Sequence, residues 1–278
     1  MSIHMEMQKL AVKEQIVKTV VKSGNGGAVW VPKDWLGQEV VVILPEKPKF
    51  GLKEKIVHLL EPYLKDIISV AIYGSYARNE HTKDSDVDVL VITKDKSIKL
   101  DFKEEKLDVT SFPIDKLKLA IQKYPTIYYQ MVQEAGPLIN AYIFEELKNI
   151  KPNKESFNNY LKETKEHIKS NRELLELDKI ENAYLKSYSI LYSSMLRLRG
   201  IFIIRCILRK DKFSNKKFKN WLEAKGLNSN EYENCYKAYR FVRDNKDAKN
   251  LIIKMQVAEK LLNILQNEFD LLDGKINE

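Results

Sequence analysis

The stretch Ile72-Tyr-Gly-Ser-Tyr-Ala-Arg-Asn-Glu-His-Thr-Lys-Asp-Ser-Asp-Val-Asp-Val-Leu-Val-Ile92 decides the fold. It begins at the end of an apolar run, Ile67–Tyr73, which predicts a buried strand. Gly74-Ser75 follows at once and would open a short helix after that strand. Because the free N–H groups and the dipole at a helix N-terminus favour an anion, this turn is a candidate phosphate site.

Two aspartates enter the next apolar run, at Asp86-Val87-Asp88. Side chains on a strand alternate between faces, so Asp86 and Asp88 would share one face while Val87 and Val89 point into the core. Two carboxylates about 7 Å apart on one face repel each other unless a cation lies between them. Mg2+ is the usual hard cation with oxygen ligands. A polar turn before the strand is the simpler alternative, but Asp88 lies inside the apolar run and argues against it.

The pattern Gly-Ser-x-Ala-Arg followed by Ser-Asp-x-Asp resembles the signature of the DNA polymerase β-like nucleotidyltransferases. It is similar in particular to the minimal (MNT-type) enzymes of archaea and bacteria, and more distantly to kanamycin nucleotidyltransferases. Members of that family carry a third carboxylate on a neighbouring strand. The apolar-alternating run Lys106–Phe112 contains one acid, Asp108, which would face the other two aspartates; a solvent-facing acid is the alternative.

The resemblance implies a role for each residue of the motif. Asp86 and Asp88 would hold two Mg2+ ions, and Asp108 would bind one of them and help to activate the acceptor hydroxyl. Gly74 and Ser75 would hold the triphosphate, with Arg78 as a helper unless it is a surface residue. Many family members have Gly where this chain has Asn79, but Asn tolerates the left-handed backbone that such a turn requires.

Residues 8–45 form a first unit with strand-like alternation, a strong turn signal at Ser23–Gly27, and further predicted strands at Ala28–Pro32 and Glu39–Leu44. The unit resembles the AbrB-like (SpoVT/AbrB) swapped-hairpin DNA-binding domains, particularly archaeal versions. That resemblance implies an intertwined homodimer, with DNA contacts from Lys18, Lys22 and Asn25. A dimerisation hairpin without DNA binding is the alternative. Pro45–Lys49 reads as a linker, which places the domain at residues 1–46.

The central part, residues 50–145, is predicted to be a mixed α/β sheet with helices. An amphipathic helix at Gly51–Lys65 leads into the catalytic strand. Helices near Ile114–Lys123 and Thr126–Glu134 and a short strand near Leu138–Tyr142 follow Asp108.

Strand signals end at Phe144, and residues 146–278 are predicted to form an antiparallel helical bundle. Helices are expected near residues 155–175, 181–210, 214–225, 229–243 and 246–270. In the second, a core stripe follows steps of four and three through Tyr184, Tyr188, Leu191, Met195, Leu198 and Phe202. Such bundles beside polymerase β-like domains often look HEPN-like. HEPN nucleases use an Arg followed four to six residues later by His, and no such pair follows Phe144, so an RNase is not expected.

Composition narrows the class of protein further. The 278 residues are 44% hydrophobic, and no apolar run reaches the roughly 18 residues of a membrane helix, which predicts no membrane partner. Two cysteines are too few for a disulfide scaffold, so a cytoplasmic protein with buried thiols is expected. The net charge is +8, and residues 151–278, with 26 basic and 18 acidic side chains, hold an excess of the same size. Its densest cluster comprises Arg197, Arg199, Arg205, Arg209, Lys210, Lys212, Lys216, Lys217 and Lys219; it would suit an anionic partner or form a solvated helical face.

These features lead to one main functional hypothesis and two alternatives. The first is an Mg2+-dependent nucleotidyltransferase that moves AMP from ATP to a hydroxyl of a protein, an RNA or a small molecule. The second is a DNA-binding regulator, as in toxin–antitoxin operons, whose transferase domain modifies a partner or is vestigial. The third is a metal-free nucleotide-binding scaffold.

Overall fold

The computed structural model describes residues 13–43, 51–83, 85–100, 102, 106–181, 184–185, 187–245 and 251–277. The chain divides into two compact units, Met1–Lys49 and Phe50–Glu278. The predicted linker Pro45–Lys49 and residues 8–12 of the predicted first unit lie outside the described residues.

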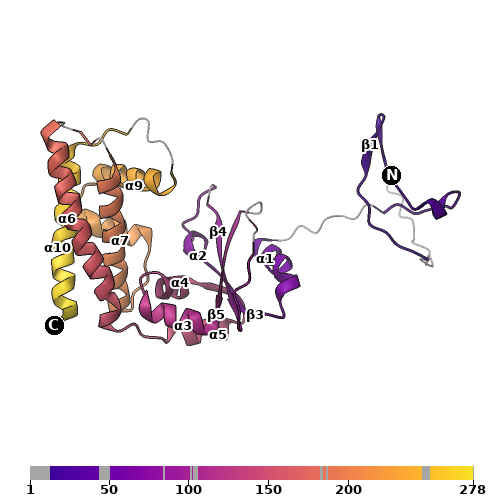
Figure 1. The fold of residues 1–278 in the computed structure, drawn as a ribbon, viewed down its shortest axis with the longest axis horizontal. Helices are drawn as coiled ribbons and strands as arrows, with labels where there is room; N and C mark the ends of the chain where they lie inside the picture. Colours follow the sequence, from indigo (N-terminus) through magenta and orange to yellow (C-terminus); the bar gives the residue numbers. More distant parts are fainter. Residues whose placement is uncertain are drawn as a thin grey trace, which may run out of the picture. The chain divides into compact units, whose positions relative to one another are not determined.

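Among residues 13–43, the N-terminal unit contains one short hairpin (Figure 1). Strands β1 (Val21–Ser23) and β2 (Gly26–Ala28) pair antiparallel, and Gly24 turns between them at a φ of 57° that favours glycine. This confirms the predicted turn. A 3-10 helix, η1 (Lys33–Trp35), follows.

Most of the strand structure predicted for this unit is missing among the residues described. β2 ends at Ala28 rather than Pro32, and residues 39–43 form no strand. A strand needs a neighbour to satisfy its backbone N–H and C=O groups. Within residues 13–43, β1 and β2 pair only with each other, and the valine-rich segment at 39–43 joins neither.

The second unit is built on a four-stranded sheet in the order β5-β4-β3-β6. Strands β3 (Ile67–Tyr73), β4 (Val87–Thr93) and β5 (Leu107–Pro113) match the three apolar runs of the sequence. β4 pairs antiparallel with β3 and parallel with β5, and β3 also pairs antiparallel with β6 (Gly136–Ile139). The predicted strand at Leu138–Tyr142 therefore begins and ends earlier, because Asn140 has a φ of 48° and starts the next helix.

Helices cover both faces of this sheet. On one face, Val70, Val89 and Val91 pack against α1 (Leu52–Leu60), which is followed by the 3-10 helix η2 (Glu61–Tyr63). On the other face, Leu90 and Ile92 pack against three helices, α3 (Ile114–Lys123), α4 (Tyr128–Glu134) and α5 (Ala141–Lys148). The predicted mixed α/β architecture is confirmed.

The C-terminal half is a helical bundle, as predicted. After a 3-10 helix, η4 (Lys154–Phe157), come α6 (Asn158–Glu181), α7 (Ser189–Arg209), α8 (Asn215–Ala224), α9 (Ser229–Arg243) and α10 (Met255–Asn277). The long helices α6, α7 and α10 run alongside one another (Figure 1) and enclose a separate apolar core. Among the helices that the structure describes, none combines the length and the apolar character needed to cross a membrane.

Three details of the predicted bundle are wrong. Helix α7 starts at Ser189 rather than near residue 181, and Tyr184, expected in its core stripe, is 48% exposed. Tyr184 instead forms a β-bridge with Lys254, just before α10, which also begins later than predicted. Leu191, Met195 and Leu198 are buried, which confirms these three members of the predicted stripe.

The bundle uses part of its positive charge internally. Arg197, Arg205, Lys217 and Lys219 of the predicted basic cluster pair with carboxylates of the bundle itself. The two free cysteines, Cys206 and Cys235, are buried in α7 and α9, as expected.

Candidate active site

The turn after β3 lies directly against an aspartate of β4. α2 (Gly74–Ala77) begins immediately after the strand, as predicted, and Gly74 adopts a φ of 69°. A Cβ added at Gly74 would collide with the carboxylate of Asp88, so only glycine fits there. The backbone N–H of Ser75 donates a hydrogen bond to Asp88, which fixes this carboxylate against the turn.

The strand register places Asp88 and Asp108 next to each other. Asp88 of β4 and Asp108 of β5 are directly opposite each other in the parallel β4–β5 ladder. On its other side, Asp88 is opposite Tyr73 of β3. All three belong to the face that packs on α3, α4 and α5, because Ala71 and Leu90, two residues along from Tyr73 and Asp88, lie in that core. Asp88 is partly buried, whereas Asp108 is exposed. The expectation that Asp108 shares a face with Asp88 is confirmed.

Asp86 occupies a less constrained position. It precedes β4, which starts at Val87, and its side chain is exposed. Asp86 is two residues from Asp88, as strand alternation requires for a shared face, but it lies outside the paired part of the strand.

The electrostatics of this face reflect crowding of negative charge. Burial, followed by the nearby charges of Asp108 and Glu134, raises the pKa of Asp88 from 3.8 to about 6, although Arg78 and the Ser75 N–H act in the opposite direction. Burial is also the largest cause that raises the pKa of Tyr73 to about 12, and Asp88, Asp108 and Glu134 add to it. The Tyr73 hydroxyl, 3.4 Å from Thr110 Oγ1, therefore remains protonated at neutral pH.

This face carries carboxylates of the kind that bind a divalent cation, but among the residues described fewer of them lie close together than a complete metal site needs. In the part of the chain that the structure describes, no three His, Cys, Asp or Glu side chains come close enough together to hold a metal ion. Asp88 and Asp108 nevertheless fit the chemistry, since their repulsion raises the pKa of Asp88 and an oxygen-seeking cation would relieve it. The metal-binding roles of Asp86, Asp88 and Asp108 stay predictions.

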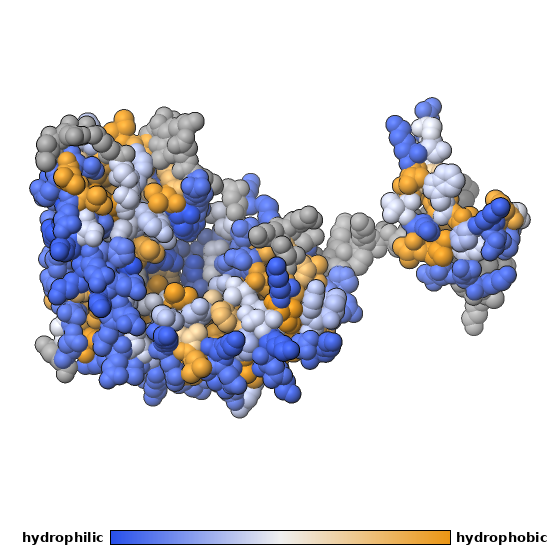
Figure 2. All heavy atoms as spheres, viewed as in Figure 1, coloured by the Kyte–Doolittle hydropathy of each residue, from blue (hydrophilic) through white to orange (hydrophobic). Residues whose placement is uncertain are grey.

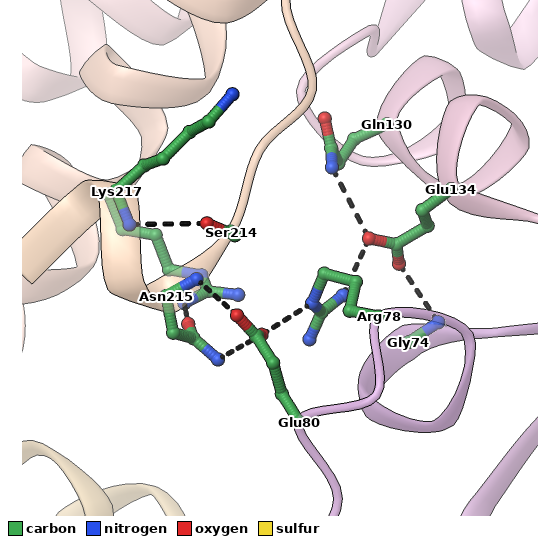
Figure 3. Close-up of polar contacts among 9 residues, drawn as sticks. Gly74, Arg78, Glu80, Gln130, Glu134, Ser214, Asn215 and Lys217 are labelled. Carbon is green, nitrogen blue, oxygen red and sulfur yellow. Dashed lines mark hydrogen bonds and ion pairs between the residues drawn. The ribbon is translucent and has the colours of Figure 1, made fainter.

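Glu134, the last residue of α4, completes the turn and was not anticipated from the sequence. Its carboxylate accepts hydrogen bonds from the backbone N–H of Gly74, at 2.9 Å, and from Arg78 Nη1, at 2.5 Å (Figure 3). Gln130, one turn earlier on α4, donates to the same carboxylate at 3.3 Å. The Arg78 side chain is only 13% exposed, so the surface-residue alternative for Arg78 is wrong.

A second carboxylate ties Arg78 to the helical bundle. Glu80 accepts from Arg78 Nε at 2.9 Å and from the backbone N–H and side-chain amide of Asn215 at 2.9 and 2.8 Å. Asn215 is the first residue of α8, so Glu80 satisfies one of the free N–H groups of that helix (Figure 3). Asn215 in turn accepts from Arg199 Nη1 of α7 at 2.7 Å.

These contacts form a continuous network from the Gly74-Ser75 turn to the bundle, through Gly74, Glu134, Arg78, Glu80 and Asn215. Burial lowers the pKa of Arg78, but the charges and hydrogen bonds of Glu134 and Glu80 outweigh that effect and raise it overall. Asn79, which lies between Arg78 and Glu80 in the sequence, has a φ of 56°. The expectation that Asn would adopt the left-handed backbone of this turn is therefore confirmed.

Comparison with known proteins agrees with this geometry. Residues 54–143 match the family model "Polymerase beta, Nucleotidyltransferase". The match runs from α1 into α5 and includes the sheet, the Gly74 turn and the aspartates, but neither the N-terminal unit nor the bundle. Residues 54–143 are therefore a nucleotidyltransferase domain of the polymerase β type, and the chain is a transferase.

Among solved structures, the chain is similar to a nucleotidyltransferase-like protein from Exiguobacterium sibiricum 255-15. The two share 16% sequence identity over 81% of this chain and 78% of that chain, with a TM-score of 0.37, which is too low to establish a common fold. No curated protein matches the chain in sequence. The AbrB-like and HEPN-like resemblances stay predictions.

Proposed function

We propose that the protein transfers a nucleoside monophosphate, AMP from ATP, to a hydroxyl acceptor and releases pyrophosphate. The observation that carries the proposal is the contact between the Asp88 carboxylate and the Gly74-Ser75 turn, with Asp108 next to Asp88 on the same face of the sheet. This contact brings a candidate phosphate-binding turn and a pair of carboxylates together inside the matched domain.

Each residue has a distinct part in this reaction. Gly74, through its backbone N–H, and Ser75 would hold the triphosphate, and Arg78 would add positive charge beside it. Asp86, Asp88 and Asp108 would hold two Mg2+ ions, which when bound would stabilise charge on the attacking and leaving oxygens. The exposed Asp108 would accept the proton of the acceptor hydroxyl. Tyr73 stays protonated and would serve as a neutral donor on this face.

The test is transfer of label from ATP in the presence of Mg2+, with the purified protein alone and with cell extract. Wild type should label an acceptor, while Asp86→Ala, Asp88→Ala and Asp108→Ala should not. Glu145→Gln is the control, because Glu145 is an exposed carboxylate of α5 that pairs only with Lys148 among the contacts described. Equal labelling by wild type and the aspartate variants would contradict the proposal.

A second function, DNA binding by a homodimer, is favoured by the N-terminal unit. None of residues 13–43 is buried, and Lys18, Lys22 and Asn25 are all exposed. A unit without buried side chains gains little from the hydrophobic effect, so a second copy is the natural source of a core. Such a homodimer would present its basic loops to an operator, as in toxin–antitoxin regulation.

Light scattering and a gel shift against the protein's own promoter test this second function. The full chain should be a dimer and should shift the promoter fragment. A chain lacking residues 1–46 should lose both properties and keep nucleotide transfer. A full chain that is monomeric at micromolar concentration would contradict the dimer.

A further inference from the structure

The carboxylate of Glu134 stands where an anionic ligand of the turn would bind. One of its oxygens accepts from the Gly74 N–H and the other from the Arg78 guanidinium. These are two of the groups assigned above to the triphosphate. The Glu134 side chain is only 11% exposed, so its contacts with the turn are largely shielded from solvent.

Two features disfavour an acid at this position apart from those contacts. Glu134 is the last residue of α4, where the negative end of the helix dipole repels a carboxylate. Asp88 lies on the adjoining sheet face and adds further repulsion, since the charge of Glu134 helps to raise the pKa of Asp88. Glu134 is thus retained by the same donors that a phosphate group would use.

Arg78, in contrast, has a second anchor. Its Nε donates to Glu80, and Glu80 is fixed by two hydrogen bonds from Asn215 at the start of α8. Arg78 also lies over the Phe213 ring, with its guanidinium carbon 5.8 Å from the ring centroid. Loss of the Glu134 contact would therefore leave Arg78 in position with part of its donor capacity released.

We propose that Glu134 is an internal anion that occupies the triphosphate site of the free protein and is displaced by the nucleotide, while Glu80 holds Arg78 in place. The two glutamates that contact one arginine thus have opposite effects on nucleotide affinity. This inference rests on the proposed function, because it takes a nucleoside triphosphate as the ligand of the turn.

The experiment measures the dissociation constant of a nonhydrolysable ATP analogue with Mg2+ by titration calorimetry, using the full-length protein. Glu134→Gln keeps the shape of the side chain and removes its charge, and should tighten binding about fivefold. Glu80→Gln loosens the anchor of Arg78 and should weaken binding by about the same factor. Glu145→Gln, the exposed control, should bind as wild type does.

The melting temperature of each free variant separates displacement from a change in fold. Glu134→Gln should melt below wild type without nucleotide, since it breaks a largely buried ion pair, and yet bind more tightly. If Glu134→Gln does not fold, Glu134→Asp, which is too short to span both donors, should tighten binding instead.

The possible results have different consequences. Weaker or unchanged binding by Glu134→Gln would overturn the inference and leave the proposed function intact. Tighter binding by both glutamine variants would also overturn it, because the effect would then be general charge repulsion. If wild type binds no nucleotide and transfers no label, the inference falls together with the proposed function.

Discussion

The sheet of the second unit and the N-terminal unit both contain valine-rich segments, but the two differ in how far their side chains are buried. In the sheet, Val70, Val89 and Val91 are completely inaccessible to solvent. In the N-terminal unit, Val42 and Ile43 are 72% and 75% exposed, and apolar side chains remain visible on its surface (Figure 2). Composition alone therefore does not decide whether such a segment becomes a strand.

The difference lies in the partners that the chain provides. Each central strand of the sheet has a neighbour on both sides and helices on both faces. The 39–43 segment has neither within the described residues of its unit. The second unit thus holds its own cores, whereas residues 13–43 of the first unit bury none of their side chains.

The sharpest test of this comparison separates catalysis from assembly. Asp88→Ala should reduce nucleotide transfer about a thousandfold, because it removes a predicted metal ligand and the brace of the Gly74 turn. Deletion of residues 1–49 should leave transfer unchanged, since the matched domain begins at residue 54. Rates of label transfer from ATP measure both. Loss of transfer on deletion would show that the second unit is not self-sufficient.

The next largest effect concerns the interior of the bundle. Glu268 is 2% exposed between Arg205, at 2.5 Å, and Lys225, at 2.7 Å, so Glu268→Ala should lower the free energy of unfolding by about 3–5 kcal/mol. Lys217→Ala, which breaks a half-exposed pair with Asp211, should lower it by less than about 1 kcal/mol. Urea titration followed by circular dichroism compares the two. Equal losses would mean that burial does not set the strength of these pairs.

Substitution of the exposed valines of the N-terminal unit should weaken the proposed homodimer and leave the stability of the second unit unchanged. Val42→Ser should weaken the proposed homodimer by about 2 kcal/mol for each side chain that the interface buries. The unfolding of residues 50–278 should not change. Analytical ultracentrifugation gives the dimer dissociation constant, and an unaltered constant would place Val42 outside the interface.

The smallest expected effect follows from the pKa of Asp88. Since its pKa is raised from 3.8 to about 6 in the folded protein, its stabilising contribution is complete below pH 3.8 and is lost as the pH rises through 6. Without divalent ions at pH 7.5, Asp88→Asn should therefore raise the free energy of unfolding, by about 1 kcal/mol after allowance for solvent screening.

For the same variant, Asp88→Asn, changes of pH and addition of Mg2+ provide two controls on this gain in stability. Its advantage over wild type should vanish well below pH 3.8, where Asp88 is neutral in both the folded and the unfolded state. Added Mg2+ should stabilise wild type and not the variant. Thermal melts across pH, with and without Mg2+, measure both effects, and an advantage that grows on acidification would contradict the assigned shift.

Sequence patterns were sufficient for the core of the site. Alternation and apolar runs predicted β3, β4 and β5, which depend on local periodicity that a single sequence displays directly. The family resemblance, which implies a third carboxylate on a neighbouring strand, predicted that Asp108 faces Asp88.

The rest of the site depends on contacts between distant segments. Glu80 meets Asn215 across 135 positions of the chain, and no periodic pattern reports such a pair. Glu134 did leave a signal, because an acid at the last position of a predicted helix opposes the helix dipole. The N-terminal strands were overestimated because a strand pattern does not say whether a pairing partner exists.

The contact between Gly74 and Asp88 makes the two halves of the motif one steric unit. A Cβ at residue 74 would collide with the Asp88 carboxylate, so Gly74 cannot be replaced while Asp88 stays where it is. A methyl group at residue 74 would push the aspartate out of line before it affected any ligand. A substitution at residue 74 would therefore displace Asp88 of β4, which lies fourteen positions further along the sequence.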